Sequence, residues 1–153
     1  MFFKFLIPIA VAMSGTTTVN AAKTEPQPGA GEVFVEPGLW NWSHQSVLIG
    51  IPVTESNTEC MPPEMAKMSL NDFAKDLDEG CSVSEDARNG GTIDFTLTCS
   101  GKYQGQATGQ LTKIDDKNLQ MSANGQVSLT LFEQQISGPF QFNASATHQG
   151  SCS

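Results

Sequence analysis

Four cysteines are the residues of this chain whose type and spacing could do chemistry, namely disulfide formation. Cys81 and Cys99 stand at equal distances from Gly90, within the turn sequence Asn-Gly-Gly at 89–91. Folding the chain back at this turn sets the two thiols opposite each other in a β-hairpin. Because no Cys-x-x-Cys pair is present, neither a zinc site nor a thioredoxin-like redox pair is indicated. We therefore predict structural disulfides and an oxidising compartment.

The hairpin register supports this pairing independently. In residues 93–99 the apolar side chains alternate with polar ones, which places Cys99 on the buried side together with Cys81. Cys60 is then left for Cys152, although four cysteines formally allow two other connectivities. The register predicts three further opposed pairs: Val83 and Leu97, Glu85 and Phe95, and Ala87 and Ile93.

Three methionines raise the possibility of copper handling. Met61, Met65 and Met68 follow each other at the spacing of one helix face, and His44 could complete a site. Soft thioether sulfurs bind Cu(I). The favoured interpretation is simpler, because methionine commonly fills irregular gaps in a hydrophobic core. No metal or cofactor is therefore predicted.

The two histidines do not indicate catalysis. His44 and His148 have no partner nucleophile motif, and the chain lacks a Gly-x-Ser-x-Gly elbow. We expect both to be exposed or hydrogen-bonded structural residues and the protein not to be an enzyme.

Aromatic residues could instead line a binding pocket for a small apolar ligand or a protein segment. The alternative is ordinary packing in the core or at a sheet edge. The possible lining residues are Trp40, Trp42, Phe95, Phe140 and Phe142.

Most of the chain reads as short antiparallel strands. Period-2 alternation marks residues 39–44, 93–99, 119–123, 127–131 and 140–146, with turns at 115–117 and at the Ser-Gly-Pro sequence 137–139. The fold class is mostly β, an antiparallel meander forming a curved or partly closed barrel-like sheet. A short helical insert is expected near residues 62–79.

The insert is predicted as two helices. The first begins at Pro62-Pro63 and carries Met65 and Met68. The second has Ser69 as N-cap, an apolar stripe over residues 70–77, and Gly80 as its end.

Residues 1–21 are typical of a secretory signal peptide, with Lys4 before an apolar segment and a cleavage site after Ala21. The apolar segment is too short to anchor the chain in a membrane. Residues 22–36 are expected to be a flexible leader and residues 37–153 a single β-rich domain. The mature protein is thus predicted to be periplasmic or secreted.

Charge excludes some partners. Loss of Lys4 leaves 7 basic and 16 acidic residues, a formal charge of −9. Nucleic acid and anionic lipid are therefore poor partners. Nine of the acidic residues lie within residues 55–86, whereas residues 118–153 carry only Glu133.

The order of these landmarks resembles a family of small exported proteobacterial proteins, domain of unknown function 3617. The resemblance covers roughly residues 35–153 and implies an exported β-rich domain without a known activity. Asn41 stands where family members often have an acidic residue. The landmarks are Pro-Gly-Leu-Trp at 37–40, Cys60 before the insert, Gly80-Cys81 and Cys99 around the glycine turn, a glycine-rich strand, and Gly-Ser-Cys at 150–152.

Three functions are compatible with the sequence. The first is a non-enzymatic binding or accessory module using the concave face of the sheet. The second is copper handling by the methionine stripe. The third is a structural envelope protein without a small ligand.

Overall fold

The computed structural model describes residues 27–152, so the expected signal peptide at 1–21 lies outside the described residues. Within the described part, no helix is long and apolar enough to cross a membrane. The elements, in chain order, are β1 (Glu32–Phe34), β2 (Gly38–Leu48), β3 (Ile51–Met61), the 3-10 turn η1 (Pro63–Met65), β4 (Lys67–Ser69), α1 (Leu70–Leu77), β5 (Cys81–Asn89), β6 (Thr92–Ser100), β7 (Tyr103–Asp115), β8 (Asn118–Leu131) and β9 (Gln134–Gly150).

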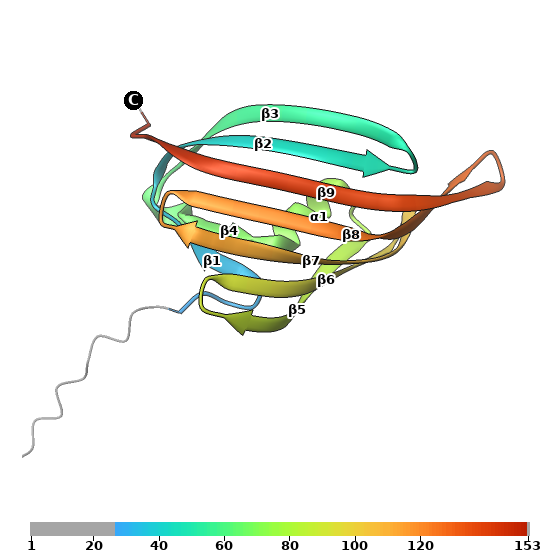
Figure 1. Cartoon of the computed structure of the whole chain (residues 1–153), viewed down its shortest axis with the longest axis horizontal. Helices are drawn as coiled ribbons and strands as arrows, with labels where there is room; N and C mark the ends of the chain where they lie inside the picture. The colour runs from blue at the N-terminus through green and yellow to red at the C-terminus, as the bar shows by residue number, and fades with distance from the viewer. Residues whose placement is uncertain (1–26, 153) are drawn as a thin grey trace, which may run out of the picture.

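Seven strands form one curved antiparallel sheet in the order β3-β2-β9-β8-β7-β6-β5 (Figure 1). The predicted mostly-β fold with a helical insert and two disulfides is confirmed. The edges are β3 and β5, and the insert of η1, β4 and α1 joins them in sequence. The chain between the two edges therefore crosses the concave face of the sheet.

The inner face explains how the sheet curls. One row of opposed residues reads Phe95, Gly109, Ala123, Phe142 across β6, β7, β8 and β9. A Cβ atom added at Gly109 would lie 2.6 Å from the Phe95 ring. Gly109 and Ala123 on β7 and β8 are small, and they leave space for the rings of Phe95 and Phe142 on the flanking strands. A curved sheet needs such space on its inner face.

The β5–β6 hairpin confirms the predicted disulfide. Cys81 is bonded to Cys99 and lies opposite it in the register. The predicted pairing of Ala87 with Ile93 is wrong, because a bulge at Asp86 shifts Ala87 to Asp94.

A second predicted feature fails in the last hairpin. Residues 137–139 lie inside β9, so the expected turn there is wrong. The chain reverses at Phe132 and Glu133, which have φ of 49° and 65°. Non-glycine residues rarely adopt this left-handed conformation.

The insert contains one α-helix rather than two. Ser69 caps α1 as predicted, because its hydroxyl accepts a hydrogen bond from the Asp72 amide at 3.4 Å. The helix expected to carry the methionines is only the 3-10 turn η1, and β4 follows it. Met61 ends β3 and Met68 lies in β4, so the three methionines do not share a helix face.

The ordered domain begins before residue 37. Val33 and Val35 are buried in the core at 5% and 7% exposure, within the expected leader. β1 pairs antiparallel with β4 in a two-stranded sheet. The burial of these two valines and the β1–β4 pairing hold residues 32–36 in place. From the sequence alone, the flexible leader is expected over 22–36 because its N-terminal part is rich in proline and glycine.

An ion pair strengthens the β1–β4 pairing and should make it pH-dependent. The Glu32 carboxylate accepts from the Gly29 amide at 3.1 Å and lies 3.2 Å from Lys67 Nζ. These partners, the Gly29 hydrogen bond first, lower the pKa of Glu32 below its usual 4.5. A lowered carboxyl pKa stabilises the folded state above pH 4.5, and the contribution is lost as pH falls through the lowered value.

We therefore expect Glu32→Gln to lower the free energy of unfolding at pH 7 by at most about 1 kcal/mol. The difference from wild type should shrink as the pH is lowered from 7 to 3, because protonation of the wild-type carboxylate removes the ion pair as the pH falls through its lowered pKa. Urea denaturation at both pH values measures it, with exposed Glu79→Gln as the control. A deficit that persists undiminished at pH 3 would contradict an ionic origin.

Candidate functional site

A cleft of about 660 Å³ opens on the concave side of the sheet, between α1 and β3. Its floor comes from β2, β8 and β9, its walls from β3 and α1, and its end from the residues around β4. The lining residues are Trp42, Ser43, His44, Glu55, Asn57, Glu59, Cys60, Met61, Pro62, Lys67, Met68, Ser69, Asp72, Phe73, Asp76, Leu77, Met121, Phe142 and Ala144.

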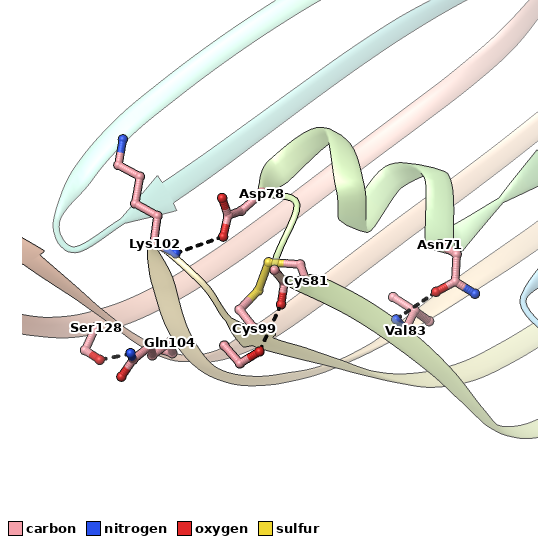
Figure 2. The surroundings of a disulfide bond; sticks show 10 residues. Asn71, Asp78, Cys81, Val83, Cys99, Lys102, Gln104 and Ser128 are labelled. Carbon is pink, nitrogen blue, oxygen red and sulfur yellow. Dashed lines mark hydrogen bonds between the residues drawn. A yellow bond between two sulfur atoms is a disulfide. The ribbon is translucent and has the colours of Figure 1, made fainter.

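The position of α1 creates this cleft. The helix is fastened toward β5, because Asn71 Oδ1 accepts from the Val83 amide at 3.0 Å and Leu70 and Ala74 are fully buried. At its end, Asp78 Oδ2 accepts from the Lys102 amide at 3.1 Å. Figure 2 shows both hydrogen bonds on either side of the Cys81–Cys99 disulfide. The helix therefore covers the β5 half of the concave face and leaves the β3 half open.

The open side explains an unusual strand. Every residue of β3 from 51 to 60 is exposed, so this strand contributes no buried side chain to the core. Glu55 and Glu59 pair in register with His44 and Trp40 of β2. Since alternate residues share one face of a strand, these two carboxylates lie on the side of the cleft.

The floor of the cleft is aromatic. The Phe142 ring lies 4.8 Å from the Phe73 ring of α1 and is stacked with His44 at 5.4 Å, measured between centroids. His44 Nε2 also lies 3.5 Å from a Glu55 carboxylate oxygen. Phe142 therefore joins the helix, the sheet and the His44–Glu55 pair in one packed group.

The structure separates the five aromatic residues proposed as pocket lining. Trp42 and Phe142 line the cleft, although Phe142 is itself only 5% exposed. The cleft lining does not include Trp40, Phe95 or Phe140, which are buried in the core. The indole N–H of Trp40 donates to the Glu36 carbonyl at 2.8 Å. The corresponding N–H of Trp42 is buried and has no hydrogen-bond acceptor among residues 27–152. An unpaired buried donor of this kind costs about 1–3 kcal/mol.

The rim of the cleft is acidic. Two carboxylates come from β3 and two from α1, and all four are exposed: Glu55, Glu59, Asp72 and Asp76. Lys67 is the lysine of the lining, and its ammonium group already pairs with Glu32. The concentration of acids in residues 55–86 was visible in the sequence, but their gathering at one cleft was not.

The copper candidates are distributed differently from the prediction. Met61, Met68 and His44 all line the cleft, but they come from three different strands. Met68 is also packed in the hydrophobic core at 9% exposure. Within the described chain, no three His, Cys, Asp or Glu side chains gather where they could hold a metal ion.

His148 has a structural contact, as expected. Its Nε2 lies 3.0 Å from the Pro37 carbonyl oxygen, and its ring packs edge-on against Trp40 at 5.5 Å. These contacts fasten β9 to the start of β2, away from the residues that line the cleft.

A second hollow, of about 460 Å³, lies on the outer face of the sheet and has a different chemistry. Its outward side chains are neutral amides and hydroxyls in register across β2, β9, β8 and β7. Such a face is typical of a solvated antiparallel sheet. The outer-face residues are Ser43, Gln45, Gln110, Thr112, Gln120, Ser122, Asn143 and Ser145.

Comparison with known proteins places this arrangement in a family but gives it no activity. Neither the curated proteins nor the solved structures contain a match to the chain. The pattern of one protein family, described as "Protein of unknown function (DUF3617)", matches residues 35–152. This match includes both disulfides, the helical insert and all strands of the large sheet. The chain therefore belongs to the DUF3617 family.

Proposed function

We propose that this protein is an exported, non-enzymatic binding module that holds a small apolar ligand in the cleft between α1 and β3. The carrying observation is the cleft of about 660 Å³, whose lining includes Trp42 on the floor and Phe73 on the α1 wall, both partly exposed, together with the more deeply buried Phe142. Ligand sites are commonly concave, mostly apolar and supplied with a few polar groups.

Export is supported by the cysteine chemistry. All four cysteines form disulfides, Cys60 with Cys152 and Cys81 with Cys99. Disulfides persist in oxidising compartments such as the bacterial periplasm. Together with the signal-peptide pattern of residues 1–21, this supports a periplasmic or secreted location.

Binding of Nile red, a neutral apolar dye, tests the cleft. Wild-type protein should raise the dye fluorescence saturably with one site. Ala144→Phe places a large side chain on the cleft floor and should weaken binding about tenfold or more, because the ligand volume is lost. If this variant does not fold, Leu77→Trp fills the cleft from the α1 wall.

The adjacent variant Ser145→Phe is the matched control. Successive residues of a strand point to opposite faces, so this side chain enters the outer hollow and should leave dye binding unchanged. Loss of binding in Ser145→Phe alone would move the site to the outer face. No saturable binding by wild type would reject the proposal and favour a structural envelope role.

Native mass spectrometry of protein purified from its own host complements the dye. The expected spectrum shows a chain cleaved near Ala21 with two disulfides, plus the mass of a small ligand. A bare chain accompanied by a polypeptide of defined mass would instead indicate that the cleft receives a protein segment. Met61, Met65 and Met68 belong to three different elements of the described chain, so the single helix face that copper handling would need is not formed.

A further inference from the structure

We infer that the ligand of this cleft is an apolar cation, a hydrocarbon body carrying an ammonium-type group. The inference rests on the proposed function and adds the chemical class of the ligand. It combines the two features of the cleft that differ most from each other, its apolar aromatic floor and its acidic rim.

The rim acts on a cation from two sides. Glu55 and Glu59 project from β3, whereas Asp72 and Asp76 lie one helical turn apart on α1. Like charges on opposite walls repel each other, and a cation held between them reduces that repulsion. Lys67 compensates little of this charge, because its ammonium group pairs with Glu32 at 3.2 Å.

The floor favours the same ligand class. Trp42 and Phe73 are partly exposed in the same cleft as these carboxylates, and their aromatic surface would pack against a hydrocarbon body. Aromatic faces also attract ammonium groups, which is how quaternary ammonium ligands are commonly recognised. An apolar anion would gain from the floor but would be repelled by the rim. A hydrophilic cation would gain from the rim alone.

Three probes with one ten-carbon chain isolate the charge: decyltrimethylammonium, 1-decanol and decanoate. Each is used to displace Nile red below its micelle-forming concentration and at low ionic strength. We expect decyltrimethylammonium to bind about tenfold more tightly than 1-decanol, and decanoate to bind most weakly. The preference for the cation should shrink as salt is raised, because exposed carboxylates are screened.

Paired charge variants test whether the rim is responsible. Glu59→Gln/Asp76→Asn removes one carboxylate from each wall and should lower the preference for the cation severalfold, with 1-decanol unaffected. The control Glu79→Gln/Glu133→Gln removes the same net charge outside the cleft and should keep the full preference. If both variants lose the preference for the cation equally, the preference arises from the net charge of the protein and not from the carboxylates of the rim.

The outcomes separate this inference from the proposed function. If Nile red binds but 1-decanol or decanoate displaces it as well as the cation does, the cleft is a ligand site of another class. If Nile red does not bind to the wild-type protein, both conclusions fail together.

Discussion

Replacing Phe142 with alanine is expected to lower the free energy of unfolding by about 3–5 kcal/mol, as for other buried phenylalanines. Phe142 is 5% exposed and opposes Ala123 on β8, so no larger neighbour in its row could fill the space left behind. Its ring also contacts Phe73 of α1 and stacks with His44. The change should therefore loosen α1 as well as create a cavity in the core.

Urea denaturation followed by circular dichroism measures this loss. Phe132→Ala is the matched control, because Phe132 is 99% exposed at the tip of the β8–β9 hairpin and should change stability little. If the free energy of unfolding falls by the same small amount in both variants, Phe142 does not have the predicted role in the core. Hydrogen exchange should also show α1 opening more easily in Phe142→Ala.

The sequence predicted the β5–β6 hairpin well because two independent signals agreed there. The symmetric cysteines and the apolar alternation of β6 both specified one register from Cys81 to Glu85. Beyond that point β5 continues with mostly polar residues. These residues carry no apolar alternation, so they do not distinguish one pairing register from a register shifted by one residue. The bulge at Asp86 was therefore invisible in the sequence.

Turn signals failed where glycine had another role. Gly138 was interpreted as part of a turn, but a Cβ atom there would lie 3.0 Å from Ile49 Cα. The position requires a small residue for close packing against the β2–β3 turn. The chain actually reverses at Phe132 and Glu133, which both have positive φ. Phenylalanine and glutamate are not the residues that such turns prefer, so the sequence carries no turn signal there.

The candidate site was only partly predictable for a geometric reason. Trp40 and Trp42 share one face of β2, and no sequence signal distinguishes a core residue from a cleft residue on that face. The distinction arises from α1, which Asn71 and Asp78 fasten near the other edge of the sheet. Glu55 and Glu59 were likewise indistinguishable from ordinary solvated charges until β3 was placed beside the cleft.

Removing the Cys60–Cys152 disulfide should have an effect of similar size to Phe142→Ala. Its 92-residue separation predicts a loss of about 4–5 kcal/mol in Cys60→Ala/Cys152→Ala, against about 3 kcal/mol for the 18-residue hairpin bridge, from loop entropy alone. Both Cys60 and Cys152 are exposed, so their replacement removes the cross-link without opening a cavity in the core.

The loss should be concentrated in one strand. In the sheet, β2 lies between β3 and β9, and the bridge spans it by joining the end of β3 to the residue two positions beyond β9. Since residues 51–60 bury no side chain, β3 is held mainly by its hydrogen bonds to β2 and by this bridge.

Hydrogen exchange of the double variant should therefore show β3 amides losing protection well before those of β6, which lies among the buried strands. Because β3 carries Glu55 and Glu59, the same variant should also bind decyltrimethylammonium more weakly while its core remains folded. Unchanged protection of β3 would mean that backbone pairing alone holds this wall of the cleft, and the bridge would then stabilise the domain only through the unfolded chain.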